Sequence, residues 1–191
     1  MHQHLIDNIS HLIRMSEEEK EWISSKFIAK QFNKGDYFLR EGQICREVGF
    51  IESGLVRYVI TKENGEELTT SFNKELEYTC NYESFLDHSP TKASIQCIEP
   101  SVILTISYDD LQALYTHVKE GEKFGRLACE YQYVLAIRQL GSLYKQDPEQ
   151  RYLQFLETYP DLVQRLPQYY ISSFVGVKPP SLSRIRKRLA K

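Results

Sequence analysis

The spacing of apolar residues changes twice along this 191-residue chain. Up to about residue 27, apolar side chains recur every three or four positions, which is the period of an amphipathic helix. From Gln31 to Ser107, short apolar or alternating runs are separated by turn-forming residues, which indicates strands. After Ser107 the helical period returns and continues to the end. The pattern therefore predicts an α+β protein, with helices flanking a central antiparallel β structure.

Two short helices are expected before the strands. Residues 1–15 have one apolar side, and Ser16 followed by Glu19 is a capping-box start for a second helix. In the central region, Asn64-Gly65 lies between two runs of strand-forming residues, which is a strong hairpin signal. Many short strands with turns at this spacing favour a compact antiparallel barrel or sandwich.

A long helix is expected from about Gly121 to Tyr144. One stripe of this helix has the alternating spacing of four and three that is found in coiled coils, and it consists of Phe124, Ala128, Tyr131, Leu135 and Arg138. A second apolar stripe runs through Leu127 and Val134. A helix that is apolar on two stripes is covered by two neighbours. The first stripe, from Phe124 to Leu135, therefore predicts a homodimer, and the alternative is a helix buried wholly within a monomer.

The residues after this helix predict a helix-turn-helix. Asp147-Pro148-Glu149-Gln150 starts one helix, with Asp147 as its N-cap, and Pro160 ends it. A second helix carries apolar residues at Ile171, Phe174 and Val175, and Gly176 suits its C-terminus. Lys178-Pro179-Pro180 cannot continue that helix, but prolines fit the first turn of the next one.

The last helix has one apolar and one basic face. Leu182, Ile185 and Leu189 fall on one side of it, and Ser183, Arg184 and Lys187 fall on the other. A helix that reads the major groove of DNA needs this division. An arginine at position 184 can form a bidentate pair with guanine, and a phosphate contact without sequence information is the alternative. The other candidate DNA contacts are Ser183 and Lys187 beside it, Ser181, which can also cap the helix, and Arg186 and Arg188, which are placed for phosphates.

Charge is distributed in a way that supports this interpretation. The whole chain has a formal net charge of −2. Before Arg138 there are 14 basic and 22 acidic side chains, whereas the remainder has ten basic and four acidic ones. A mildly acidic protein with a concentrated basic end is suited to local contact with the phosphate backbone. A basic, solvated C-terminal helix without a partner is the alternative.

Other chemistry-bearing residues indicate neither an enzyme nor a resident cofactor. The four cysteines, Cys45, Cys80, Cys97 and Cys129, are at least 17 positions apart, so they form no C-x-x-C pair and are expected to be reduced thiols that mostly fill the core. The N-terminal histidines and the acidic residues have no spacing that predicts a metal site or a catalytic pair. No apolar run reaches the roughly 20 residues of a membrane span, and no signal peptide is evident, so a cytoplasmic location is expected.

Two stretches resemble the Crp/Fnr regulators, the family of the cyclic-AMP receptor protein and the fumarate-nitrate regulator. Residues 34–42 and 49–57 resemble the glycine-punctuated start of that family's β-roll. Residues 171–177 and 181–187 resemble its helix-turn-helix, in which a Ser-Arg pair reaches bases and phosphates. The resemblance implies three parts, namely an antiparallel β-roll of the double-stranded β-helix or jelly-roll type at 1–116, a dimerisation helix and hinge at 117–145, and a helix-turn-helix domain with a reduced wing at 146–191.

The sequence departs from the members of that family that bind cyclic nucleotides. Those members hold the ribose and the cyclic phosphate with a Gly-Glu followed by an Arg-Ser or Arg-Thr, in which the arginine supplies the charge for the phosphate. Here Tyr82-Glu83 can supply the glutamate, but Ala93 lies near the position expected for the arginine. We therefore expect an effector other than cAMP. The candidate residues of its pocket are Glu83, Lys92, Ser94 and Tyr131.

The sequence thus predicts a homodimeric, sequence-specific DNA-binding transcription regulator. Its expected partners are double-stranded DNA with an inverted repeat, a second copy of the chain and an unidentified small-molecule effector, with RNA polymerase as a further candidate and no membrane. Two alternatives remain open. One is a ligand-binding β-roll module with a degenerate DNA-binding end, and the other is an enzyme on a barrel scaffold.

Overall fold

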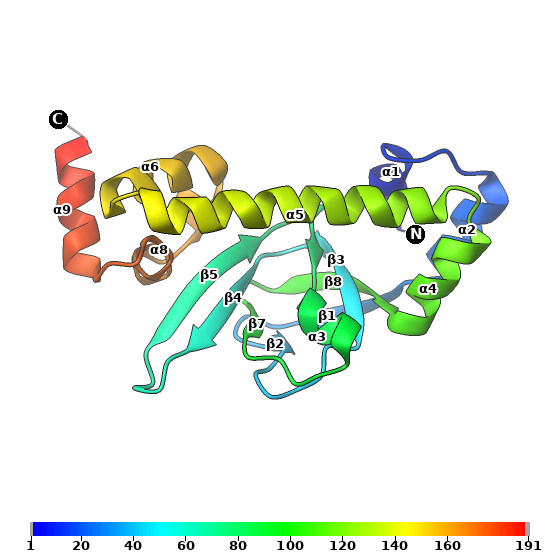
Figure 1. Cartoon of the computed structure of the whole chain (residues 1–191), viewed down its shortest axis with the longest axis horizontal. Coiled ribbons are helices and arrows are strands. Elements are labelled where there is room, and N and C mark those ends of the chain that lie inside the picture. Colours follow the sequence, from blue (N-terminus) through cyan, green and yellow to red (C-terminus); the bar gives the residue numbers. More distant parts are fainter. Residues whose placement is uncertain (1, 190–191) are drawn as a thin grey trace. The chain divides into compact units, whose positions relative to one another are not determined.

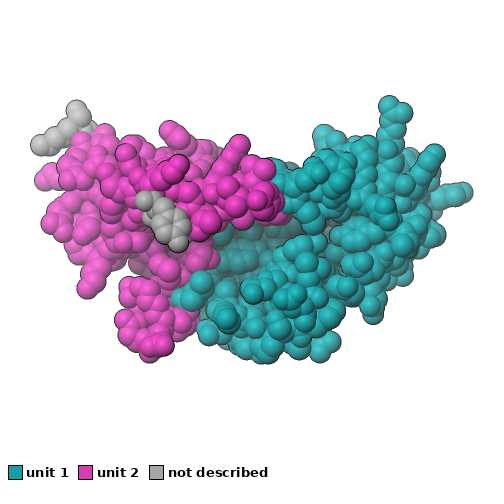
Figure 2. Space-filling model, viewed as in Figure 1, with its two compact units in different colours: residues 1–60, 71–131 teal, residues 61–70, 132–191 magenta. Residues whose placement is uncertain are grey.

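The computed structural model describes residues 2–189, with the backbone alone for residues 142–144, and the chain forms two compact units (Figure 2). The first unit comprises residues 1–60 and 71–131, and the second comprises residues 61–70 and 132–191. This division differs from the three predicted parts. The long helix is shared between the units, and the tip of a β-hairpin groups with the C-terminal helices.

The first unit begins with two helices, α1 (Gln3–Ser10) and α2 (Glu17–Lys26). Helix α1 ends earlier than the predicted residue 15 but buries Leu5 and Ile9 as expected. The predicted capping box of α2 is confirmed. The Glu19 backbone N–H donates to the Ser16 hydroxyl at 3.2 Å, and the Ser16 N–H donates to the Glu19 carboxylate at 2.8 Å.

The predicted antiparallel β-roll is confirmed (Figure 1). Its strands are β1 (Ile28–Phe32), β2 (Tyr37–Leu39), β3 (Glu47–Ser53), β4 (Val56–Thr61), β5 (Glu67–Asn73), β6 (Tyr78–Thr79), β7 (Ser94–Cys97) and β8 (Ser101–Ser107). One sheet has the order β1-β8-β3-β6 and the other has the order β2-β7-β4-β5. Strand β8 lies between β1 and β3, so that Ile103 is opposite Lys30 on one side and Ile51 on the other. Strands that are distant in sequence are thus neighbours in each sheet.

Glycines permit two of the tight connections. In the β4–β5 hairpin, the Gly65 N–H donates to the Lys62 carbonyl at 2.8 Å, and Gly65 has a φ of +80°. A turn followed by a glycine in the left-handed region is a common hairpin loop. Gly54, between β3 and β4, has a φ of +104°, and a Cβ there would lie 2.6 Å from the Cβ of Ser101. Any side chain at position 54 would therefore collide with the start of β8.

The first unit also contains the helices α3 (Tyr82–Asp87) and α4 (Tyr108–His117). Helix α5 (Gly121–Lys145) begins in the first unit and ends in the second. Helix α3 was not predicted. It starts at Asn81, whose side chain accepts a hydrogen bond from the Ser84 N–H at 3.0 Å. The apolar core of the unit collects side chains from both sheets and from α1 to α5, among them Leu5, Ile23, Phe50, Phe85, Ile103, Leu114 and Phe124.

The C-terminal part of the second unit is helical, with α6 (Pro148–Thr158), α7 (Leu162–Arg165), α8 (Gln168–Val175) and α9 (Pro179–Leu189). The capping box predicted at Asp147 and Gln150 is present. Between α6 and α8 the structure has the short helix α7, and residues 146–189 contain no strand, so this region has no β-wing. The aromatic rings of Tyr159 and Phe174 pack against Phe155 with centroids 5.6 Å away in both cases.

Candidate DNA-binding helix and effector-binding domain

The turn between α8 and α9 has the geometry that the sequence predicts. Gly176 has a φ of +78°, and the Val177 N–H donates to the Ser172 carbonyl at 2.9 Å. This 6→1 bond satisfies a carbonyl that the end of α8 would otherwise leave without a partner. Pro179 and Pro180 occupy the first turn of α9, where the missing N–H groups cost no helical hydrogen bond.

Helix α9 buries two of its three predicted apolar residues, leaves Leu189 40% exposed, and exposes most of its polar face. Leu182 is 0% and Ile185 5% exposed, and both belong to the buried residues of the second unit. The predicted DNA contacts Ser183, Arg184, Lys187 and Arg188 are exposed, whereas Ser181 and Arg186 are half-buried. The helix thus presents hydroxyl and basic groups together on one accessible side.

The Arg184 side chain lies back along its own helix. Its Nε donates to the Pro180 carbonyl at 3.4 Å, and its Nη2 donates to the Ser181 hydroxyl at 3.2 Å. Both acceptors are neutral, so these contacts orient the guanidinium without cancelling its charge. They also occupy the Ser181 hydroxyl with the arginine, a role that the sequence did not suggest.

Arg188 differs from Arg184 because it has an acidic partner. Its Nη2 forms an ion pair with the carboxylate of Glu149 in the first turn of α6. The sequence assigned Arg188 to a phosphate contact and gave no sign of this pair. Since the arginine side chain is 65% exposed, the pair contributes little to stability. It does mean that a phosphate must compete with Glu149 for this arginine.

The side chain of Arg151 in α6 is hydrogen-bonded to the backbone at the end of α8. Its Nε donates to the Val175 carbonyl at 2.8 Å and its Nη1 donates to the Gln146 carbonyl at 2.7 Å. A charged donor forms a stronger hydrogen bond to a carbonyl than a neutral donor does. This side chain therefore fixes the end of α8 relative to the start of α6. Sequence reasoning did not identify it, because the contact joins positions 24 residues apart.

The tip of the β4–β5 hairpin contacts α8 within the second unit. The Thr69 N–H donates to the Ser173 hydroxyl at 2.8 Å, and that hydroxyl donates to the Glu67 carbonyl at 3.1 Å. One serine thus makes two hydrogen bonds with the backbone of β5. Ser173 lies in the stretch that resembles a helix-turn-helix, but nothing local predicts its strand partner.

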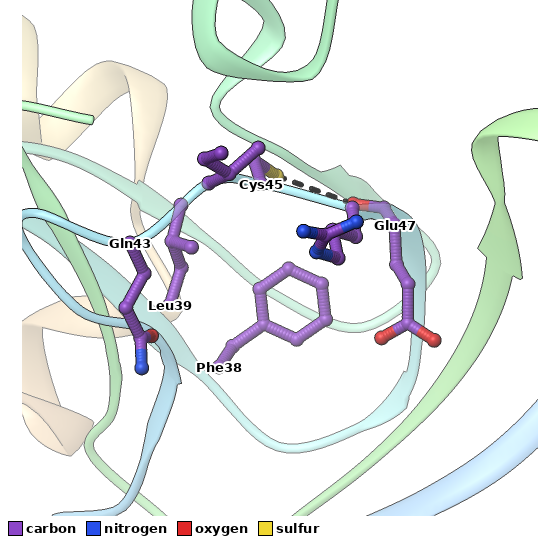
Figure 3. A pocket seen from close by; sticks show the side chains of 7 residues that line it. Phe38, Leu39, Gln43, Cys45 and Glu47 are labelled. Carbon is purple, nitrogen blue, oxygen red and sulfur yellow. Dashed lines mark hydrogen bonds between the residues drawn. The ribbon is translucent and has the colours of Figure 1, made fainter. Parts of the chain in front are cut away.

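In the first unit, a cavity of about 430 Å³ lies beside the connection from β2 to β3 (Figure 3). Its wall is formed by Phe38, Leu39, Gln43, Ile44, Cys45, Arg46 and Glu47. Figure 3 shows the Phe38 ring and the Cys45 side chain on the wall, and a dashed line marks the hydrogen bond from Cys45 Sγ to the Glu47 carbonyl. None of the four predicted effector residues belongs to this wall.

The structure places those four residues in different settings. Glu83 is exposed in the first turn of α3, Lys92 is exposed before β7, and Tyr131 is exposed on α5. Ser94 is buried, and its hydroxyl accepts a hydrogen bond from the Glu41 N–H at 2.9 Å. Ser94 therefore has a structural contact that sequence reasoning did not anticipate.

The four predicted dimer residues differ in how far the structure exposes them. Phe124 is 6% exposed and packs on Tyr78 in the core of its own chain, with ring centroids 6.2 Å apart, so it is not available to a second subunit. Ala128 is half-buried, whereas Tyr131 and Leu135 are exposed. The sequence pattern merged a core position with surface positions, because both follow the same helical period.

The described residues were compared with the requirements of a metal site and of a membrane-spanning helix. No group of three or more His, Cys, Asp or Glu side chains is arranged there to hold a metal ion. None of the helices within residues 2–189 is long and apolar enough to cross a membrane.

A family model of the cyclic nucleotide-binding domain matches residues 29–118. The match covers the β-roll and runs through α4. No curated protein sequence matches the chain.

Solved structures extend the likeness from the β-roll to most of the chain. CLP from Xanthomonas campestris, described as a c-di-GMP responsive global regulator, is 15% identical with a TM-score of 0.70, and the match covers 92% of each chain. FixK2 from Bradyrhizobium japonicum is 13% identical with a TM-score of 0.72, over 86% of this chain and 84% of that one. The Thermus thermophilus catabolite activator protein is 21% identical with a TM-score of 0.60, over 96% and 86%. The cyclic nucleotide-binding domain is thus followed by the helices of the Crp/Fnr fold, and the resemblance inferred from sequence is confirmed.

Proposed function

We propose that this chain is a sequence-specific DNA-binding transcription regulator that works as a homodimer. The observation that carries the proposal is helix α9, which is anchored by buried Leu182 and Ile185 and presents Ser183, Arg184 and Lys187 on its exposed face. Proteins with this fold include a global regulator and a catabolite activator. Exposed basic and hydroxyl groups on a helix after a tight turn match what major-groove reading requires.

Selection of bound sequences from a random duplex pool tests the proposal. A regulator should enrich one sequence, and because a two-fold dimer carries two reading helices, the enriched site should be an inverted repeat. Affinity for this site and for a scrambled duplex should then be measured at two salt concentrations. A preference that persists at the higher salt supports specific reading. Enrichment of no sequence would favour the alternative of a ligand-binding module with a degenerate DNA-binding end.

Dimerisation is proposed to use the exposed side of α5. Within the second unit, Tyr133, Ile137 and Leu140 follow each other at spacings of four and three and are 67%, 50% and 49% exposed. This is the spacing of a coiled-coil seam, and a second copy of the same helix is its natural cover. At about 100° per residue, these three positions lie roughly opposite Tyr131 and Leu135 on the helix. The proposed interface therefore uses Tyr133, Ile137 and Leu140 in place of the predicted Phe124, Ala128, Tyr131 and Leu135.

A glutamate at Ile137 or at Leu140 is expected to produce monomers with weak affinity for DNA. Burying an unpaired carboxylate in an apolar seam is unfavourable, and a single reading helix loses the second half-site. Light scattering at micromolar concentration measures the mass. Gln132→Glu is the control, since it adds a charge to the same helix at an exposed polar position and should leave the dimer intact. A monomeric parent protein would contradict the proposal.

The effector is proposed to be a small molecule other than cAMP. The Thr91 hydroxyl accepts a hydrogen bond from the Ala93 N–H at 3.1 Å and donates one to the Ala93 carbonyl at 3.0 Å. The Ser94 hydroxyl accepts one from the Glu41 N–H. Both hydroxyls in this segment are thus engaged with the backbone, and the segment supplies no arginine for a phosphate. The fold alone does not determine the ligand.

Calorimetry should accordingly show weak binding of both cAMP and cGMP, and neither nucleotide should change the affinity for DNA. The physical reason is that the cyclic phosphate finds no guanidinium at this segment to offset its loss of hydration. A low-micromolar dissociation constant for either nucleotide would overturn this prediction.

The hairpin provides a route from the β-roll to the reading helix. Strands β4 and β5 arise in the β-roll, and Ser173 of α8 holds the backbone of β5 at Glu67 and Thr69. In this proposal, an effector that moves the hairpin favours one arrangement of α8 and α9 over another. The two reading helices of the dimer would then change their spacing.

A further inference from the structure

Two cysteines that are far apart in the sequence meet in the first unit. Cys45 precedes β3 and Cys80 follows β6, and their Sγ atoms are 3.7 Å apart. Both are free thiols in the structure. A disulfide bond has an S–S length of about 2.05 Å, so the two sulfur atoms need to approach by only about 1.6 Å to become bonded. The sequence analysis treated these residues as core filler, because a separation of 35 positions does not predict a pair.

We propose that Cys45 and Cys80 form a dithiol site that hydrogen peroxide and other small hydroperoxides oxidise to a disulfide, with Cys45 as the attacking thiolate and Cys80 as the resolving thiol. Nothing in the proposed DNA-binding function requires this reaction, so the two can be tested separately.

The position of Cys45 gives a small oxidant a way to reach it. Although Cys45 is only 1% exposed, it lies on the wall of the 430 Å³ cavity beside Phe38 and Arg46. Hydrogen peroxide is close to water in size, and a hollow of this volume can admit it. Glutathione disulfide is too large to reach the buried Cys45, although Cys80 is only half-buried, and the proposal is therefore limited to small hydroperoxides.

Hydrogen bonding assigns different roles to the two sulfur atoms. The contact with the Cys80 thiol lowers the pKa of Cys45 to about 7, the backbone of Asn81 adds to this effect, and burial opposes it. The Cys45 thiol also donates to the Glu47 carbonyl at 3.4 Å, and that bond favours its protonated form. The contact between the two sulfur atoms raises the pKa of Cys80, as does burial. Of the two sulfur-bearing residues, Cys45 is also the one on the cavity wall. We therefore assign the attack on the peroxide to Cys45 and the resolving step to Cys80.

The reaction is balanced without any further reagent. The Cys45 thiolate attacks one peroxide oxygen, the O–O bond breaks, and the products are Cys45 sulfenic acid and hydroxide. The Cys80 sulfur then attacks the sulfenic sulfur, the S–O bond breaks, and water leaves with the proton from Cys80. Overall, two thiols are oxidised by two electrons, and one peroxide is reduced to two waters. A thiol reductant reverses the reaction by exchange.

The test uses the full chain with Cys129 replaced by serine, because that exposed thiol would react between molecules. Reduced protein is exposed to hydrogen peroxide, alkylated, digested and analysed by mass spectrometry. We expect linked peptides that carry Cys45 and Cys80, and dithiothreitol should separate them. In a Cys80→Ser variant the link should disappear, and dimedone should trap a sulfenic acid on Cys45.

Cys97→Ser is the matched control. Cys97 is also buried, its hydrogen-bond partner is the Ser101 hydroxyl, and burial raises its pKa to about 11. The control should leave the rate and the site of linkage unchanged. Oxidation of Cys45 no faster than that of Cys97 would overturn the proposal. So would a Cys45 sulfenic acid that accumulates in the presence of Cys80 without forming the link.

The pH dependence gives a second readout. Besides Cys80, the carboxylate of Glu47 acts on Cys45 and raises its pKa. The Tyr58 hydroxyl is hydrogen-bonded to the Cys80 backbone, and it stays protonated because burial raises the pKa of its phenol. Arg46 lines the same cavity. The thiolate exists above the pKa, so the rate of oxidation should rise with pH and reach half its maximum at about 7. A midpoint near the ordinary thiol value of 9.0 would contradict the assignment of Cys45 as the attacking group.

Discussion

Replacing Phe155 with alanine is expected to lower the free energy of unfolding of the C-terminal helices by about 3–5 kcal/mol. Phe155 is 1% exposed, and its ring packs against the rings of Tyr152, Tyr159 and Phe174. The substitution removes a large apolar surface and leaves a cavity between α6 and α8, both of which support the reading helix. A loss of this size is comparable to the whole stability of a small domain. DNA binding should therefore weaken together with folding.

Hydrogen exchange of α8 and α9, read by mass spectrometry, measures the local effect of Phe155→Ala without interference from the β-roll. Leu153→Ala is the control, since Leu153 lies on the same helix and is 41% exposed. It should cost less than about 1 kcal/mol, because little apolar surface is lost from the interior. Equal acceleration of exchange in both variants would contradict the assignment of Phe155 as the centre of this core.

Arg184→Ala is expected to cost roughly 1–3 kcal/mol on the preferred site and to relax the preference at one base pair in each half-site. The guanidinium is exposed on α9, and its present contacts are to the neutral Pro180 carbonyl and Ser181 hydroxyl. Both are easily exchanged for the two acceptors of a guanine. Titration of specific and scrambled duplexes at two salt concentrations measures the effect. An equal loss on both duplexes would identify Arg184 as a phosphate contact.

Arg188→Ala is the informative comparison for Arg184→Ala. An arginine that contacts only phosphate should weaken all duplexes alike and flatten the salt dependence by about one unit. The ion pair with Glu149 should make both effects smaller, because Arg188 must leave a carboxylate to reach a phosphate. Glu149→Gln should accordingly strengthen binding to every duplex slightly. No change in that variant would mean that Arg188 does not move to DNA.

Local signals made the helix-turn-helix predictable. Gly176 and the two prolines act within one turn of their own position, and the capping boxes at Ser16 and Asp147 involve residues only three apart. The β-roll was predictable as a class, because its turns are marked in the sequence, although its strand order was not. Helix α3 was missed because Asn81 starts only a short helix of six residues inside a region rich in strands.

The remaining features depend on contacts between distant positions, and no local pattern encodes them. Ser173 meets Thr69 across 104 positions, Arg188 meets Glu149 across 39, and Cys45 meets Cys80 across 35. Phe124 shows the opposite problem, since its helical period is correct but gives no indication of which neighbour covers it. Periodicity thus identifies a face of a helix, and only the fold assigns a partner to that face.

The position of Ser173 also bears on aggregation. Strand β5 ends the sheet with the order β2-β7-β4-β5, so its outer edge has no further strand beside it. Open edges of this kind are templates on which a strand of another molecule can add. Because the Ser173 hydroxyl occupies both the Thr69 N–H and the Glu67 carbonyl, it blocks that edge where a second chain would begin to pair. Helix α8 therefore covers the outer edge of β5 at two backbone groups that would otherwise be open to a strand of another molecule.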